Sequence, residues 1–243
     1  KSDIMEKVVN DAVESKNGTS KGNDNMSMGH KKIEYEEYEK NKERASQLYD
    51  RIITDFSVPG TNYLKYYVPS KPSEKEIAYL WPYMQAYALA NTMLELDMGN
   101  TAYKENLLKI IGGLENYRST FSDEVCYQSY PTEFGGGDTF YDDNIWIAKE
   151  LFRSYKILGD EAFLTTAEGI FTYVTGGWNE KTGGLYWKEA NCSIMTTCTN
   201  APTAIVALKL YKETGYKSYF DWSLKIYKWV KSNLLSENGV FWD

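Results

Sequence analysis

The sequence contains a single histidine, His30, in a polar stretch near its N-terminal end. One histidine argues against a Ser-His-Asp triad and against a metal site built from several histidines. Cysteine is scarce as well: Cys126, Cys192 and Cys198 are odd in number and form no CxxC pair. This gives neither a zinc signature nor a disulfide framework. Cys192 and Cys198 either pair across a short loop or remain small unpaired side chains.

Long apolar runs and clusters of basic residues are also absent. No stretch is long and apolar enough to span a bilayer, and the N-terminal end lacks the basic and apolar pattern of a signal peptide. A leader that has been removed would leave the same sequence. The net charge of −7, without clustered Lys and Arg, argues against nucleic acid and anionic membrane surfaces as partners.

Apolar and aromatic residues are abundant. The 243 residues are 42% hydrophobic and include 21 tyrosines and 7 tryptophans, enough for a sizeable core and for ligand contacts. Residues 1–32 are polar and predict a flexible N-terminal tail. Apolar residues then recur at helical spacing, which predicts an all-α fold with no convincing strand pair. The predicted helices are 33–56, 77–96, 102–117, 143–158, 161–174, 202–214 and 219–234.

The predicted helices form an internal repeat. Short turns centre on Gly99, Gly159 and Gly215, and glycine is the residue expected just after a helix end. The offset between the last two turns is 215 − 159 = 56. Two long loops end alike, in Gly-Leu-Tyr-Trp (184–187) and Gly-Val-Phe-Trp (239–242), with an offset of 239 − 184 = 55. Hairpins with alternating short and long connections predict an α/α toroid, in which an outer ring of helices surrounds an inner one. Polar residues at the ends of the long loops then meet at one mouth.

Two adjacent carboxylates, Asp142 and Asp143, stand at the start of the fourth predicted helix, behind the glycines at 135–137. Neighbouring side chains on a helix diverge by about 100°, so the two carboxyl groups flank one spot. Such a pair can hydrolyse a glycosidic bond, with retention when the groups lie about 5–5.5 Å apart and with inversion at about 6.5–9.5 Å. The alternative is that one of the aspartates simply caps the helix.

Four elements, in their order and spacing, make the chain resemble glycoside hydrolase family 76 from about Ile33 to its end. They are Trp-Pro-Tyr (81–83), Tyr-Asp-Asp-Asn-Ile-Trp (141–146), Gly-Leu-Tyr-Trp (184–187) and Cys-Thr-Asn-Ala-Pro (198–202). The resemblance implies an (α/α)6 toroid and retaining endo-hydrolysis of α-1,6-linked mannan. It implies that Asp142 is the nucleophile and that Asp143 is the general acid and base. It also implies an exported protein, extracellular, periplasmic or on the cell surface.

Further residues of the predicted mouth are candidates for binding the glycan. Trp81, Tyr141, Trp178 and Trp187 offer rings for sugar stacking, Asp138, Asn144 and Asn200 offer polar groups for sugar hydroxyls, and Asp243 falls at the mouth by its repeat position. The alternatives are a core position for each aromatic residue and a loop-capping role for Asp138 and Asn200. We expect no cofactor and no metal, although Asp138, Asp142 and Asp143 are a conceivable set of oxygen ligands.

An (α/α)6 toroid has twelve helices, whereas this sequence predicts about seven. We therefore expect an incomplete domain over residues 33–243 that lacks its C-terminal part and self-associates through exposed inner helices. Two other functions stay open: a non-catalytic glycan-binding remnant of the same scaffold, and another toroid enzyme such as a lyase, an epimerase or an unsaturated-uronyl hydrolase. The second is disfavoured because the mouth segments hold few basic residues beyond Lys149 and Lys188.

Overall fold

The structure is a computed structural model that describes residues 24–70, 76–189 and 191–243, except for the side chains of residues 24–35, 191 and 192. The chain divides into two compact units, residues 1–45 and residues 46–243. The first unit contains the beginning of a long helix, α2 (Asp24–Phe56), which starts earlier than the expected Ile33. The rest of the predicted tail, residues 1–23, lies outside the described residues.

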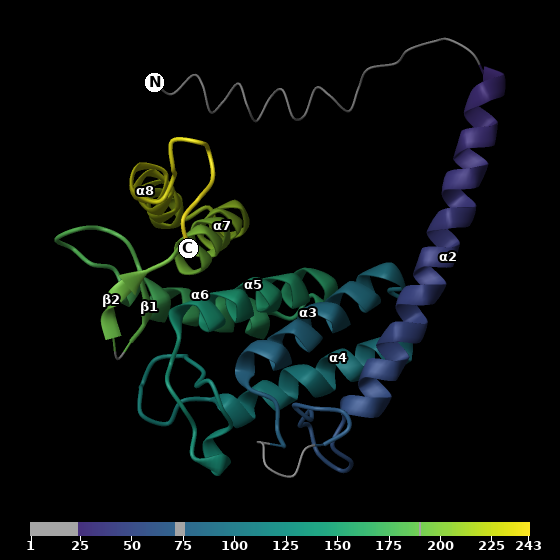
Figure 1. Cartoon of the computed structure of the whole chain (residues 1–243), viewed down its shortest axis with the longest axis horizontal. Helices are drawn as coiled ribbons and strands as arrows, with labels where there is room; N and C mark the ends of the chain where they lie inside the picture. Colours follow the sequence, from purple (N-terminus) through teal and green to yellow (C-terminus); the bar gives the residue numbers. More distant parts are fainter. Residues whose placement is uncertain (1–23, 71–75, 190) are drawn as a thin grey trace. The chain divides into compact units, whose positions relative to one another are not determined.

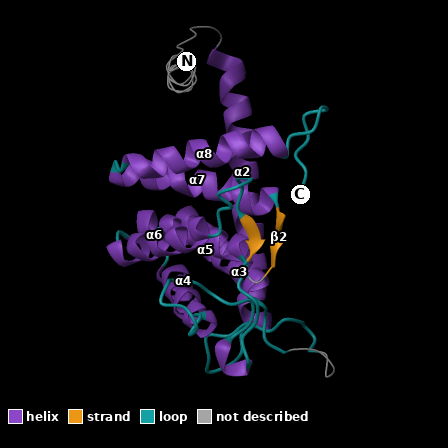
Figure 2. Ribbon diagram, turned by 90° about the vertical axis from the view of Figure 1, so that its left-hand side faces the viewer, coloured by secondary structure: helices purple, strands orange, loops and turns teal. Residues whose placement is uncertain are grey.

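The second unit is built of helical hairpins (Figure 1). Helix α3 (Leu80–Leu96) pairs with α4 (Thr101–Leu114), α5 (Tyr141–Leu158) with α6 (Glu161–Gly176), and α7 (Thr197–Thr214) with α8 (Lys217–Asn233). Helix α5 contacts both α3 and α7, and Figure 2 shows the hairpins stacked one on another. Two short 3-10 helices, η1 (Glu115–Tyr117) and η2 (Thr132–Phe134), lie in the loops. The described residues thus form seven α-helices in the alternating order of an α/α toroid, as predicted.

The short turns of the predicted repeat have the same geometry in the structure. Helices α5 and α7 each end at a left-handed glycine, Gly159 (φ 72°) and Gly215 (φ 75°). Their N–H groups donate to the carbonyls of Tyr155 and Tyr211, each over 2.8 Å. A side chain disfavours this conformation, so glycine ends both helices at the same point. The short connections therefore lie at one end of the hairpins and the long loops at the other.

A strand pair and the start of α7 also depart from the prediction. A two-stranded antiparallel sheet, β1 (Tyr186–Lys188) with β2 (Asn191–Met195), precedes α7 where no strand pair was expected. Strands of 3 and 5 residues are too short to give a clear alternating pattern. Helix α7 begins at Thr197, earlier than the expected Pro202, which lies inside the helix. Proline favours the first helical position, and further along it removes one backbone hydrogen bond.

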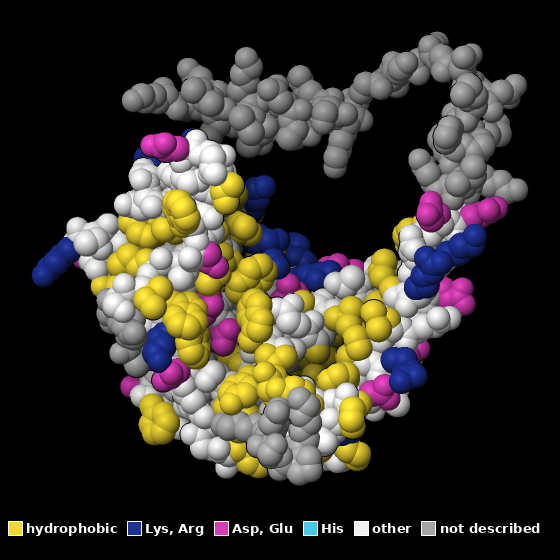
Figure 3. Space-filling model, in the orientation of Figure 1, with side chains coloured by type: hydrophobic (Ala, Val, Ile, Leu, Met, Phe, Trp, Pro, Cys, Tyr) yellow, Lys and Arg dark blue, Asp and Glu magenta, His cyan; other side chains and the backbone are white. Residues whose placement is uncertain are grey.

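The core lies between the helices of the hairpins. Tyr83 and Tyr87 of α3, Ile145 of α5 and Leu210 of α7 are all 0% exposed. On the face shown in Figure 3, hydrophobic side chains also reach the surface of the second unit and lie among acidic ones. Within the part of the chain that the structure describes, no helix has the length and apolar character needed to cross a membrane.

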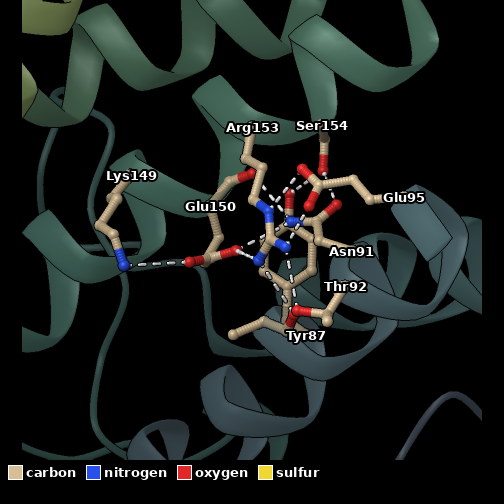
Figure 4. Close-up of polar contacts among 9 residues, drawn as sticks. Tyr87, Asn91, Thr92, Glu95, Lys149, Glu150, Arg153 and Ser154 are labelled. Atoms are coloured by element: carbon tan, nitrogen blue, oxygen red, sulfur yellow. Dashed lines mark hydrogen bonds and ion pairs between the residues drawn. The ribbon is translucent and has the colours of Figure 1, made fainter. Parts of the chain in front are cut away.

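A buried polar network joins α3 to α5 (Figure 4). The Glu150 side chain is 2% exposed, and its carboxylate accepts hydrogen bonds from Asn91 Nδ2 (3.0 Å) and from Arg153 (3.3 Å). The Asn91 side-chain oxygen accepts a hydrogen bond from Ser154 Oγ (2.8 Å), which also bonds to the Tyr87 hydroxyl (2.6 Å). Because the carboxylate has its partners, the network holds the two helices together without leaving a buried charge unpaired.

We predict that Glu150→Ala lowers the free energy of unfolding by about 2–4 kcal/mol, because Asn91 and Arg153 lose a buried acceptor. The matched control is Asp221→Ala. It removes a carboxylate that is 57% exposed and pairs with the 79% exposed Lys217, and should cost at most about 1 kcal/mol. Urea unfolding followed by circular dichroism measures both variants. Equal losses in the two would contradict the prediction.

Candidate active site

The Asp142 carboxylate is held by donors from three segments of the chain. Its Oδ1 accepts the backbone N–H of Asp143 (2.9 Å), and its Oδ2 accepts the indole Nε1–H of Trp187 (2.8 Å) and the Cys198 thiol (3.4 Å). Burial raises the pKa of Asp142 above its ordinary value, and these hydrogen bonds oppose that rise by stabilising the charged form. A position in the first turn of α5 adds the positive end of the helix dipole. The carboxylate is therefore fixed in orientation and supported as an anion.

Asp143 lies in a different environment. It is 9% exposed, and within the described residues its carboxyl group accepts no hydrogen bond. Burial, and to a smaller extent the negative charge of Asp142, raise the pKa of Asp143 to about 7. In such unequal surroundings, the hydrogen bonds favour the ionised form of Asp142, whereas nothing opposes the rise in the pKa of Asp143. The pair can supply an anion and an acid at the same spot.

Asn144 ties the start of α5 to the loop before it. The residue is 0% exposed. Its Oδ1 accepts the N–H of Tyr127 (2.8 Å), and its Nδ2 donates to the carbonyls of Tyr127 (2.9 Å) and Phe140 (2.7 Å). An amide so deeply buried and so fully bonded to backbone cannot meet a sugar hydroxyl. This corrects the expected glycan contact of Asn144, which instead positions the chain that leads into Asp142.

Asn200 makes the same set of bonds at the equivalent position of the next repeat, at an offset of 200 − 144 = 56. Its Oδ1 accepts the N–H of Leu185 (2.8 Å), and its Nδ2 donates to the carbonyls of Leu185 (3.0 Å) and Thr196 (2.9 Å). The residue is 0% exposed, so it has the loop-capping role rather than the expected glycan contact. We call the bonds of Asn144 and Asn200 the asparagine locks. The second lock fixes Leu185, two residues before Trp187.

Two of the aromatic candidates pack in the fold. Tyr141 is 8% exposed, and its ring lies 5.1 Å from the ring of Tyr173. The backbone of Gly177 lies so close that an added Cβ would come within 2.6 Å of the Tyr141 ring. Trp178 packs edge-on against Trp222 at 5.7 Å. Tyr141 therefore has the core role that was the alternative, which corrects the stacking of sugars expected on it. Trp178 is half-buried, and the stacking expected on it stays a prediction.

The other two aromatic candidates are the half-buried Trp187 and the exposed Trp81. Trp187 has its ring 4.8 Å from that of Phe140, and its hydrogen bond turns the indole edge toward Asp142. Trp81 is 44% exposed and contacts Trp146 edge-on at 6.3 Å. Trp146 follows Asp142 by one helical turn, so Trp81 lies beside the face of α5 that carries the carboxylate.

Asp138 and Asp243 occupy different places. Asp138 forms an ion pair with Lys188 (2.5 Å) and lines a cleft of about 520 Å³ beside the glycine loop. Asp243 lies at the start of α7, where its Oδ1 accepts the N–H of Cys198 (2.9 Å). The structure thus brings Asp243 close to Asp142 through Cys198. Among the described residues, no three His, Cys, Asp or Glu side chains come together as possible metal ligands.

Cys198 and Trp146 also lie in this region, although neither was among the predicted site residues, and Lys149 was expected only as a basic residue of the mouth. Lys149 Nζ lies 4.3 Å from the centre of the Trp146 ring. Positions 142, 146 and 149 share one face of a helix, and this spacing was a usable signal. Cys198 stands at the position equivalent to Asp142 in the next repeat, since 198 − 142 = 56, and this was a second usable signal.

Comparison with known proteins gives a family and a fold. The family model described as glycosyl hydrolase family 76 matches residues 54–243. A family 76 glycoside hydrolase from a bovine Bacteroides thetaiotaomicron strain superposes with a TM-score of 0.75 at 23% identity, over 82% of this chain and 44% of that one. An inactive variant of an α-1,6-mannanase of Salegentibacter sp. HEL1_6, with two consecutive aspartates replaced and α-1,6-mannotriose bound, superposes with a TM-score of 0.68 at 21% identity, over 83% and 54%.

Among curated proteins, mannan endo-1,6-alpha-mannosidase DCW1 of Candida glabrata is 25% identical over 152 residues, which are 59% of this chain and 33% of that protein. The chain spans about a third of the length of this relative and about half of the length of the solved structures. At these identities the superpositions establish a common fold.

We predict that Asn200→Ala lowers the free energy of unfolding by about 2–4 kcal/mol, because it removes the partners of the buried backbone N–H and carbonyl of Leu185. Hydrogen exchange at the Leu185 amide should accelerate. The matched control is Asn233→Ala, since that amide is exposed and donates to one carbonyl only. Urea unfolding and hydrogen exchange measure the two effects. Unchanged protection of Leu185 would show that the lock does not hold the loop.

The raised pKa of Asp143 predicts how stability depends on pH. Between its ordinary value of 3.8 and about 7, the folded chain keeps a proton that the unfolded chain releases, so stability falls as pH rises through this window. Asp143→Asn removes this loss and should raise the free energy of unfolding at pH 8 by about 2 kcal/mol, with a smaller effect near pH 4. Urea unfolding at pH 4, 6 and 8 tests this, with the exposed Asp123→Asn as control. A constant offset between Asp143→Asn and wild type would refute it.

Proposed function

Because the chain belongs to glycosyl hydrolase family 76, we propose that it acts as a retaining endo-hydrolase of α-1,6-linked mannan. The observation that carries this proposal is the contrast between two adjacent carboxyl groups at the start of α5. Asp142 accepts three hydrogen bonds, whereas Asp143 is buried without a donor among the described residues and has a pKa of about 7. This is the division between nucleophile and acid that glycoside hydrolysis with retention requires.

In the first step, a carboxylate oxygen of Asp142 attacks the anomeric carbon of a mannosyl residue. Asp143 donates its proton to the glycosidic oxygen, the bond to the leaving chain breaks, and a covalent ester joins the sugar to Asp142. The negative charge of Asp142 also favours the oxocarbenium-like transition state. Its hydrogen bonds to Trp187 and Cys198 keep the carboxylate in place during the attack.

In the second step, the ionised Asp143 takes a proton from a water molecule. The water oxygen attacks the anomeric carbon, the ester bond breaks, and Asp142 is released as a carboxylate. Two displacements at the same carbon leave the anomeric configuration unchanged. Trp81 and the ring of Trp187 provide apolar surface on which sugar rings can stack.

The printed names of the relatives support the choice of substrate. DCW1 of Candida glabrata is named a mannan endo-1,6-alpha-mannosidase, and the Salegentibacter variant that lacks two consecutive aspartates is described as inactive and holds α-1,6-mannotriose. Asp142 and Asp143 are consecutive in this chain as well. Since mannan is a polymer outside the cytoplasm, we propose an exported protein, extracellular, periplasmic or on the cell surface.

We predict that the chain releases oligosaccharides from α-1,6-mannan and that Asp142→Asn or Asp143→Asn lowers the rate by about 10³-fold or more. Asp123→Asn, an exposed aspartate, should keep the wild-type rate. Proton NMR of the first product should show the α anomer. The rate should fall above about pH 7, because Asp143 loses the proton that it donates.

A glycan-binding protein without turnover is the competing function. In that case Asp142→Asn would merely alter the affinity for mannotriose, and neither form would release product. A folded wild-type chain that binds mannotriose and releases nothing would therefore overturn the proposed hydrolysis. Release of the β anomer would leave hydrolysis intact and refute the retaining mechanism.

A further inference from the structure

Cys198 is the second residue of α7, and its thiol points at the candidate nucleophile. Its Sγ lies 3.4 Å from Asp142 Oδ2 and 3.1 Å from Thr196 Oγ1. Its backbone N–H donates to Asp243 Oδ1 over 2.9 Å. The side chain is partly exposed and unpaired as a thiol. Cys198 therefore lies between two carboxylates, one bonded through its sulfur and one through its backbone.

The fold brings Cys198 to this place through the repeat. The offset of 198 − 142 = 56 equals that of Asn144 and Asn200, and of Gly159 and Gly215. Because α5 and α7 are neighbours and each has its own asparagine lock, equivalent residues at their starts come together. The contact between sulfur and carboxylate thus follows from packing in the core rather than from a chance position of a loop.

We infer that Cys198 is a positioning residue for Asp142. The inference rests on the proposed function, in which Asp142 must attack from one fixed orientation. Oδ2 of Asp142 accepts two donors from different segments, Trp187 on β1 and Cys198 on α7, and together they leave the carboxylate little freedom to rotate. A thiol is a weak donor, so it orients the anion without stabilising it as strongly as a hydroxyl would.

The thiol is suited to remain a neutral donor. Burial, with a contribution from the charges of Asp142 and Asp243, raises the pKa of Cys198 to about 12. A thiolate at this position would repel the carboxylate, whereas the protonated thiol donates to it. Among the described residues, the groups that act on Asp142 are Asp143 on its own helix, Trp187 on β1 and Cys198 on α7. None of them carries a positive charge, so the hydrogen bonds are the main support of the anion.

The test compares pH profiles of kcat and kcat/KM on α-1,6-mannan for wild type, Cys198→Ala, Cys198→Ser and the buried Cys126→Ala. Cys198→Ala should lower kcat about tenfold with little change in KM, and should move the acidic limb upward by about half a pH unit, because Asp142 loses one donor. Cys198→Ser restores the donor and should restore both the rate and the limb. Cys126→Ala should leave the limb in place, since Cys126 is 1% exposed and does not contact Asp142.

A Cys198→Ala variant with wild-type kcat and an unmoved acidic limb would overturn the inference. Equal losses in Cys198→Ala and Cys198→Ser would also overturn it, because the residue would then act through its size alone. Carboxyl ¹³C NMR titration separates this failure from a failure of the proposed function, since it needs no turnover. If the pKa of Asp142 rises in Cys198→Ala and not in Cys198→Ser, the thiol supports the carboxylate even in a chain that releases no product. If neither variant changes that pKa, the inference is wrong.

Discussion

The asparagine locks are the constraint on which the arrangement of the site depends. A loop that enters a helix through the core must find partners for its buried backbone groups, and an asparagine side chain offers the same donor and acceptor as a peptide group. The Asn144 side chain bonds to the backbone N–H and carbonyl of Tyr127, and the Asn200 side chain bonds to those of Leu185, as the backbone of a neighbouring strand would. Each asparagine also donates to the carbonyl of the residue four positions before it in the chain. Asp142 lies beside one lock and Trp187 follows the other. The two groups that meet at the site are thus placed by buried contacts, not by surface loops.

The difference between the two aspartates lies in what surrounds them. The fold gives Asp142 three donors and gives Asp143 none among the described residues. A donor to Asp143 would make the folded chain more stable at neutral pH, but it would also stabilise the charged form and lower the pKa that an acid needs. Stability and proton donation therefore make opposite demands on this one carboxyl group. The buried network around Glu150 lies deeper between α3 and α5, where no such demand applies and the carboxylate has its donors.

The sequence predicted the features that depend on local geometry. Hairpins, short turns and the internal repeat follow from helical spacing and from left-handed glycines such as Gly159 and Gly215, and the side-by-side carboxylates follow from the pitch of one helix. The roles of Asn144, Asn200 and Tyr141 could not be predicted in this way. The same residue types bind sugars at a surface and fill or satisfy a core, and only tertiary packing decides between the two. The Asp142–Cys198 contact depends on packing between two hairpins, although the repeat offset already pointed to it.

The repeat also explains why the site is asymmetric. Residues one repeat apart have the same role where they build the fold, as with the two locks and the two glycine stops, and differ where they face the mouth. The positions that correspond to Asp142 and Asp143 hold Cys198 and Thr199. Carboxylates there would have placed four acids around one mouth, and each ionised group would have raised the pKa of the others. A thiol donates to Asp142 instead, and the Thr199 hydroxyl bonds to Thr196 within its own helix start. The repeat therefore sets where the two helices begin. At the position equivalent to Asp142 it has Cys198, whose thiol donates to the Asp142 carboxylate, whereas a second carboxylate there would repel it.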